Sequence, residues 1–509
     1  MQMQGFTWID LIILIVYLIV VLLIGLHFAK REMKGKEYFK GDGTIPWWVT
    51  SVSIFATLLS PISFLSLAGN SYAGSWIMWF AQLGMLLAIP LTIRFFLPIY
   101  SKLDIDTAYH YLELRFDSKA LRILGAVMFI VYQVGRMSII MYLPCMVLSS
   151  LMGINVNILI VIMGVIAIIY SYTGGLKSVL WTDFIQGSVL LIGVTFALVF
   201  LIAHLDGGFA AIWQDFTQNS KFLAPNEPIF DPNLLKTSVF LLIVGAGFNT
   251  MGSYVSSQDI VQRFTTTTDT KKLNKMMLTN GLLSIFIATV FYLIGTGLHV
   301  FYQVQGNELP PAAQQDQIFA SWIAFELPVG VTGLLLAAIY AAAQSTLSTG
   351  LNSVASSWTL DIQERLSKKK LSFETQTKIG RIVSLVVGIF SIVVSMILAN
   401  GNIKSAYEWF NGFMGLVLGI LFGTFILGAF TKCANTFGAF AAFIAASGVM
   451  IYIKYFVPAE SVSIWSYSLI SIAVSLVVGI PASLIWSKIK KQKSIPAPNT
   501  TIYKDKKAK

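Results

Sequence analysis

The sequence has few charged residues and almost no cysteine. Asp, Glu, Lys and Arg make up 12% of the 509 residues, whereas 56% are hydrophobic. A chain with so little charge cannot cover an ordinary soluble surface, so we expect an all-α polytopic membrane protein. The two cysteines, Cys145 and Cys433, lie in or beside apolar runs, which argues against a disulfide framework and a cysteine-based zinc site.

Catalytic signatures are also missing from the sequence. It contains no HExxH motif, no GxSxG motif and no pair of acids within its apolar runs, and its four histidines lack metal-ligand spacing. We therefore do not expect an enzyme. A channel or a non-transporting solute sensor is excluded less well, and only uptake against a gradient would distinguish these from a transporter.

Long apolar runs dominate what is present. The net charge of +11 comes from Lys and Arg that gather in short loops, which indicates membrane topology and not nucleic-acid binding. The first run, from about Trp8, lacks a basic leader and a cleavage site, so we expect a retained span. We expect the N-terminus outside and the C-terminus in the cytoplasm, because this orientation leaves few Lys and Arg residues outside. About thirteen spans are predicted, at 7–29, 47–73, 76–101, 120–151, 156–173, 178–204, 237–262, 277–304, 329–358, 380–400, 405–430, 434–457 and 463–486.

Residues 46–76 have the pattern of a membrane helix that is interrupted near its middle. Pro61 lacks a backbone donor and crowds the preceding turn, so nearby carbonyls lose their helical partners where Ser60 and Ser63 supply hydroxyls. Such backbone at membrane depth persists only inside protein or beside a cavity, where it offers oxygen atoms to a hard cation. The alternative is a simple proline kink that both serines patch.

A second cluster of small and polar residues, VGAGFNTMGSYVSS at 244–257, follows five spans later. Because five is odd, a repeated five-helix unit inserts its second copy upside down, and paired broken helices indicate the central site of a secondary transporter. The predicted divisions are an extra helix with a cytoplasmic loop (1–46), a first five-helix repeat (47–204), an extracellular loop (205–236), a second, inverted repeat (237–430), two C-terminal helices (431–487) and a basic cytoplasmic tail (488–509).

Polar side chains in two spans predict an ion site. Ser345, Ser348 and Thr349 share one helix face, with Thr346 beside them. Hydroxyl faces often only join neighbouring helices. However, Asp183 is a rare carboxylate within the apolar runs, and an intramembrane acid indicates function. Carboxylate, hydroxyl and freed carbonyl oxygens together suit Na⁺, a hard ion.

Arg136, in QVGRMS, is the other exceptional charge. No acid lies within a helical turn of it, and its planar guanidinium matches the carboxylate of an anionic ligand. Pairing with backbone carbonyls or with a distant acid is the structural alternative. Gln82 could add hydrogen bonds to a ligand, or could simply join two helices.

Several segments resemble the sodium/solute symporter family over nearly the whole chain. They are YSYTGGLKSVLWTDFIQG (170–187), AAIYAAAQSTLSTGLNSVASS (337–357) and SSQDIVQRF (256–264). ATLLSPISF (56–64), VGRMSII (134–140) and Gln82 are most similar to bacterial sodium-coupled sialic acid transporters. This resemblance implies the leucine-transporter-type fold, two inverted five-helix repeats plus extra helices.

The resemblance also implies ligand sets and a function. It implies import of sialic acid (N-acetylneuraminate) coupled to two Na⁺ ions. Transport would proceed by alternating access through a monomer in the inner (cytoplasmic) membrane. The alternative solutes are proline, pantothenate or another sugar acid. The implied ligands are Ala56, Leu59, Ala342, Ser345 and Thr346 for the first sodium, Asp183, Ser345, Ser348 and Thr349 for the second, and Ser60, Ser63, Gln82 and Arg136 for the substrate.

Overall fold

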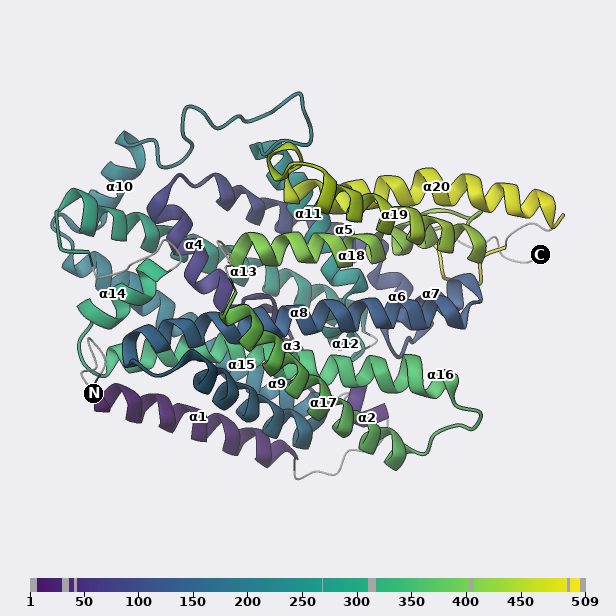
Figure 1. The fold of residues 1–509 in the computed structure, drawn as a ribbon, viewed down its shortest axis with the longest axis horizontal. Helices are drawn as coiled ribbons and strands as arrows, with labels where there is room; N and C mark the ends of the chain where they lie inside the picture. Colours follow the sequence, from purple (N-terminus) through teal and green to yellow (C-terminus); the bar gives the residue numbers. More distant parts are fainter. Residues whose placement is uncertain are drawn as a thin grey trace.

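A computed structural model describes residues 7–29, 36–40, 44–267, 269–309, 317–401, 406–491 and 495–503. All regular elements in these ranges are helical, and most long helices lie alongside one another (Figure 1). Within these ranges, eleven helices are long and apolar enough to cross a membrane, and one bent pair and the shorter apolar helix Val156–Ile169 add to them. This number of helical segments is roughly consistent with the thirteen spans predicted.

The first half of the chain contains the predicted first broken helix and the two longest helices. Helix α9 consists of two helical stretches that meet at a kink at Gly175, whose φ of 57° few other residues adopt. The elements are α1 (Trp8–Ala29), α2 (Lys36–Lys40), α3 (Trp47–Leu58), α4 (Pro61–Ala73), η1 (Ile77–Trp79), α5 (Phe80–Phe95), α6 (Leu97–Leu103), α7 (Ala108–Phe116), α8 (Lys119–Met152), α9 (Val156–His204) and α10 (Gly208–Gln218).

The second half contains a second broken helix and the hydroxyl-rich helix. The elements are α11 (Val239–Ser256), α12 (Gln258–Phe264), α13 (Thr270–His299), η2 (Val300–Val304), α14 (Ile318–Glu326), α15 (Val331–Ser357), η4 (Trp358–Gln363), α16 (Glu364–Leu366), α17 (Phe373–Ala399), α18 (Ala406–Phe430), α19 (Thr436–Phe456), η5 (Ala459–Ser461), η6 (Ile464–Ser466) and α20 (Tyr467–Ile489).

The span around Pro61 is broken and not merely kinked. Leu59 and Ser60 both have extended backbone, and α3 and α4 meet at an angle of 62°. Proline stands at the first position of α4, where a helix needs no amide donor, so the second half restarts without strain. Five spans later, extended Ser257 separates α11 from α12. Two interruptions therefore lie where the sequence predicts them.

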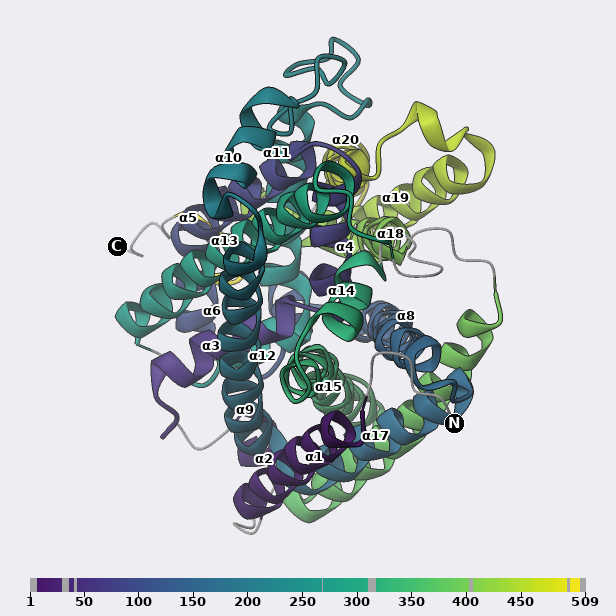
Figure 2. The ribbon, with the colours of Figure 1, turned by 90° about the vertical axis from the view of Figure 1, so that its left-hand side faces the viewer.

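Helix α15 lies at the centre of the molecule. In the most apolar stretch of 18 residues within Val331–Leu366, 89% of the residues are buried. When the molecule is turned by 90°, α15 is surrounded by α1, α8, α9 and α17 (Figure 2). A helix buried on every side packs its hydroxyl face against protein and not against lipid. The Ser/Thr face of α15 is thereby directed to its neighbours.

Helices α5 and α11 approach unusually closely. A methyl group built on Gly84 would lie 2.1 Å from the carbonyl oxygen of Ile243, and one on Gly247 would lie 3.0 Å from that of Gly84. Only glycine permits such contact between helix backbones. This packing sets the separation of two helices that border the central cavity described below.

The segments outside the spans are partly structured. The predicted loop 205–236 contains α10, an 11-residue helix, and its Lys221 donates from Nζ to the carbonyl oxygens of Tyr72 and Gly74 at the end of α4. Within the predicted second repeat, α14 precedes α15, whereas residues 310–316 lie outside the described residues. The same holds for parts of the predicted segments 1–46 and 488–509.

The two ends of the described chain lie at opposite ends of the bundle. Helix α1 begins at one end and α20 finishes at the other (Figure 1), as an odd number of spans requires. The predicted basic tail does more than offer charge to lipid: the Tyr111 hydroxyl donates to the carbonyl oxygen of Thr500 at 3.0 Å, and the Ile502 amide donates to that of Ala429 at 3.1 Å. Part of the tail thus packs against α7 and α18.

Candidate functional site

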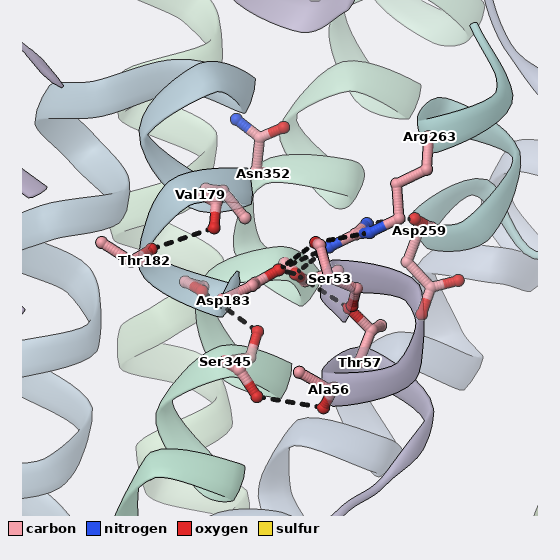
Figure 3. A network of polar contacts seen from close by, with 12 residues as sticks. Ser53, Ala56, Thr57, Val179, Thr182, Asp183, Asp259, Arg263, Ser345 and Asn352 are labelled. Atoms are coloured by element: carbon pink, nitrogen blue, oxygen red, sulfur yellow. Dashed lines mark hydrogen bonds and ion pairs between the residues drawn. The ribbon is translucent and has the colours of Figure 1, made fainter. Parts of the chain in front are cut away.

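The residues predicted for the first sodium site come together where α3 ends against α15. The Ser345 hydroxyl donates to the carbonyl oxygen of Ala56 at 3.1 Å and to that of Ala342 at 3.1 Å (Figure 3). Thr346 donates to Ala342 at 3.0 Å. Leu59 lies at the break itself, with an extended backbone. Carbonyl and hydroxyl oxygens from two separate helices are therefore within reach of one another.

The chemistry of this cluster suits a small hard cation. All of its polar atoms are oxygens, and it lies in a buried region, since Ser345 and Thr346 have no exposed surface. Hydroxyl groups can turn their hydrogens away and present lone pairs, so each could exchange its hydrogen bond for a contact with Na⁺. The interrupted helix supplies carbonyls whose regular helical bonding ends here.

The residues predicted for the second sodium site also lie near one another. Asp183 on α9 accepts at Oδ2 from the Thr349 hydroxyl at 3.1 Å, and from Ser53 at 2.7 Å. Ser348 donates to the carbonyl oxygen of Ser345 at 3.0 Å. The second carboxylate oxygen of Asp183, Oδ1, is buried and has no hydrogen-bond partner among the described residues. It remains available to a ligand.

Arg263, which lies one residue beyond the predicted span 237–262, is part of this second cluster. Its side chain is fully buried and its Nη2 contacts Asp183 Oδ2 at 2.7 Å and Thr349 Oγ1 at 2.6 Å (Figure 3). Sequence reasoning gave Arg263 no role, because a basic residue beside a polar loop favours a cytoplasmic location.

A cavity of about 120 Å³ lies beside the two breaks. Three of the four predicted substrate residues line it: Ser63, Gln82 and Arg136. Ser60 is buried at the start of α4 and is not part of the cavity wall. The structure thus brings polar side chains of α4, α5 and α8 to one cavity, and Ser60 is not among the residues that line it.

Arg136 is both a wall residue and an ion-pair partner. Its Nη1 lies 2.5 Å from Asp259 Oδ2, and its Nη2 donates to the carbonyl oxygen of Thr57 at 2.5 Å. The structural alternative considered for Arg136, pairing with a backbone carbonyl or a distant acid, is therefore present. Because Arg136 also borders the cavity, an anionic ligand there would compete with Asp259 for the same guanidinium.

Sequence reasoning missed several other wall residues. Asn249 lies on α11 in the cluster noted as a possible second break, but no role was assigned to it. Its Nδ2 is buried and has no hydrogen-bond partner within the described chain. Asp259 was missed because its ion pair joins segments 123 residues apart. The wall also includes Ser253, Ser257, Tyr132, Phe410 and Trp465.

Many membrane-spanning helices, two broken helices and a polar cavity between them define a class of protein. This architecture is that of secondary transporters, which hold solute and ion where discontinuous helices meet. The comparisons with known proteins agree.

The chain belongs to the sodium:solute symporter family, whose profile matches residues 38–446. Members of this family are transporters and not enzymes, and sodium is the coupling ion.

Named relatives narrow the comparison. The sodium/sialic acid symporter SiaT of Proteus mirabilis (strain HI4320) is 35% identical over 89% of this chain and 91% of its own length. The sodium/sialic acid symporter NanT of Aliivibrio fischeri (strain ATCC 700601 / ES114) is 31% identical over 94% of each chain.

Solved structures confirm the fold. A substrate-bound, outward-open Na⁺-coupled sialic acid symporter superposes with a TM-score of 0.85 at 32% identity, covering 94% of this chain and 98% of the other. Mhp1, a nucleobase-cation-symport-1 family transporter, matches with a TM-score of 0.59 at 15% identity, over 90% of this chain and 95% of its own, which shows the shared fold alone. The leucine-transporter-type fold expected from the sequence is confirmed.

Proposed function

We propose that this protein imports sialic acid, N-acetylneuraminate, across the cytoplasmic membrane by symport with Na⁺. The observation that carries the proposal is the position of Arg136: a buried guanidinium in the wall of a central cavity, beside a broken helix whose carbonyls meet the hydroxyls of α15. A guanidinium in such a place binds a carboxylate. The relatives named as sodium/sialic acid symporters support this choice of acid.

The proposed substrate ligands are Arg136 for the carboxylate and Ser60, Ser63 and Gln82 for other oxygens of the sugar acid. Ser63 and Gln82 border the cavity directly. Ser60 would reach the substrate only through a change in the helix break that brings its hydroxyl to the cavity. Any carboxylated solute would satisfy Arg136, so a symporter for proline, pantothenate or a different sugar acid is the second candidate.

Two sodium ions are proposed, each held by oxygen atoms of different helices. The first would bind Ala56, Leu59 and Ala342 through their carbonyls and Ser345 and Thr346 through their hydroxyls. The second would bind Asp183, Ser345, Ser348 and Thr349. An ion that joins α3 to α15 stabilises only the arrangement that holds these helices together, so sodium shifts the population toward the state that accepts substrate.

The proposed orientation follows from the distribution of basic residues, with the N-terminus outside and the C-terminus in the cytoplasm. One chain contains the complete cavity and both ion clusters, which supports function as a monomer.

Uptake into proteoliposomes tests the function. Labelled N-acetylneuraminate should accumulate above its external concentration when a sodium gradient is imposed, and should not when choline replaces sodium. Proline, pantothenate and gluconate serve as competitors. Strong competition by one of these, without uptake of N-acetylneuraminate, would favour the second candidate. Equilibration without accumulation would indicate a channel.

A further inference from the structure

Four buried charges form a continuous chain between the proposed second sodium site and the substrate cavity. Asp183 contacts Arg263, and Asp259 contacts Arg136. Arg263 also donates from Nη1 to the backbone carbonyl oxygen of Asp259, which joins the two pairs. Each of the four side chains is at most 4% exposed. Acid and base alternate from α9 through α12 to α8.

The chain of charges is neutral as the structure shows it. Two carboxylates face two guanidinium groups, and water does not screen them in this buried place. Adding Na⁺ alone would leave one positive charge in excess, and adding an anionic substrate alone would leave one negative charge. Adding both restores neutrality. A buried charge is strongly unfavourable without a partner, so the two ligands favour each other's binding.

Arg263 makes contacts that a second sodium ion would also need. Its guanidinium lies against Asp183 Oδ2 and Thr349 Oγ1, which are two of the four oxygen ligands proposed for that ion (Figure 3). A guanidinium and a sodium ion cannot both occupy this space. The unpartnered Oδ1 of Asp183 gives an entering ion a first contact before Arg263 leaves.

Resting on the proposed function, we propose that Asp259 and Arg263 are positioning residues that exchange ion-pair partners and thereby couple sodium to substrate. Sodium at Asp183 displaces Arg263. The displaced Arg263 then pairs with the carboxylate of Asp259, which lies one helical turn away on α12. Asp259 then releases Arg136, whose Nη1 becomes free for the substrate carboxylate. Release of substrate lets Arg136 and Asp259 pair again, which returns Arg263 to Asp183 and expels the sodium ion.

The first test measures sodium without substrate. Thermal unfolding of the purified full chain in detergent is followed against NaCl, with choline chloride keeping the ionic strength constant. Arg263→Gln removes the internal competitor, so the sodium concentration at half effect should fall at least about threefold below that of the unmodified protein. Arg263→Lys retains the positive charge and should lie closer to the unmodified protein. An unchanged or raised half-effect concentration in Arg263→Gln overturns the exchange.

The second test uses Asp259→Asn with N-acetylneuraminate as the probe, in calorimetric titrations at about 1 mM and about 100 mM NaCl, which differ roughly a hundredfold in sodium concentration. Without the carboxylate that competes for Arg136, affinity at low sodium should rise at least about tenfold, and the ratio between the two affinities should shrink. An affinity that falls equally at both concentrations, or that matches the unmodified protein, contradicts the proposal. This arm stands alone if Arg263→Gln does not fold.

Asp361→Asn is the matched control. Asp361 is equally buried and its Oδ1 pairs with Arg122 Nε at 2.6 Å, but it is not part of the cavity wall. It should change stability without changing the effect of sodium on substrate affinity. If the unmodified protein binds no N-acetylneuraminate at either concentration, the proposed substrate is wrong, and the first test still decides whether Arg263 and sodium compete.

Discussion

Arg136 contacts Asp259 and the carbonyl oxygen of Thr57, so replacing it removes more than a substrate ligand. Arg136→Ala alone would leave the buried Asp259 carboxylate without the opposite charge that its Oδ2 contacts, at a cost of roughly 3–5 kcal/mol of stability. The double variant Arg136→Gln/Asp259→Asn removes both charges. We expect it to unfold near the temperature of the unmodified protein while binding N-acetylneuraminate at least about 100-fold more weakly in a calorimetric titration. Near-normal affinity would remove the carboxylate role of Arg136.

Ser345 is the one side chain shared by both proposed sodium sites. Ser345→Ala should raise the sodium concentration for half-maximal uptake by about tenfold, because one oxygen ligand of roughly 1.4 kcal/mol is lost. Ser353→Ala is a suitable control, since Ser353 is equally buried on α15 and its hydroxyl donates only to the carbonyl oxygen of Gly350, at 2.9 Å. If Ser345→Ala and Ser353→Ala need the same sodium concentration for half-maximal uptake, the proposed location of the ions is wrong.

Among whole elements, α5 and α11 approach each other closely, backbone against backbone. Gly84→Ala would place a methyl group 2.1 Å from the carbonyl oxygen of Ile243, and backbone cannot move aside as a side chain can. The two helices should separate, with a loss of about 1–3 kcal/mol of stability. Because Gln82 and Asn249 border the cavity from these helices, uptake should fall as well.

The control for this substitution is Gly448→Ala in α19, where an added methyl group meets no atom within 4 Å. There the change should be neutral or should stabilise by up to about 1 kcal/mol, because alanine favours the helix. Melting temperatures in one detergent compare the two variants. Equal temperatures would mean that the close approach of α5 and α11 is not needed for stability.

Elements with a local physical cause could be predicted from the sequence, and those with a distant cause could not. Pro61 determines the first break by itself, and the membrane thickness determines the span lengths. The second break, at Ser257, has no proline, so small residues located the region but not the residue. Helix α10 was missed because the glycine, proline and asparagine around it favour a loop.

The candidate site shows the same division. The hydroxyl face of α15 follows from helical spacing alone, and contacts from Ser345 and Thr346 confirm its proximity to α3. Arg263 could not be placed from local sequence, because its partner Asp183 is 80 residues away and on another helix. Only the assembled bundle shows that a charge beside a loop turns inward.

For the whole molecule, the structure joins a central helix to two broken ones. Helix α15 is buried among α1, α8, α9 and α17, and its contacts with α3 include the oxygen cluster and the hydrogen bond between Thr57 and Thr349 beside Asp183. Polar contacts that an ion can replace allow the two parts to separate and join again. Apolar contacts of the same extent would hold one arrangement permanently. The location of the oxygen clusters at this boundary is therefore what alternating access requires.

The number of sodium ions determines how the molecule responds to voltage. Two Na⁺ with one carboxylate carry one net positive charge inward, and each charge gains about 2.3 kcal/mol per 100 mV, or roughly 50-fold in accumulation. A potassium diffusion potential, negative inside proteoliposomes, should therefore stimulate uptake. The variant Asp183→Asn/Arg263→Gln removes the second site and its counter-charge together, so its uptake should lose the response to potential while still requiring sodium. Uptake by the unmodified protein that ignores the potential would mean one sodium per anion, and Asp183 would then have no role as an ion ligand.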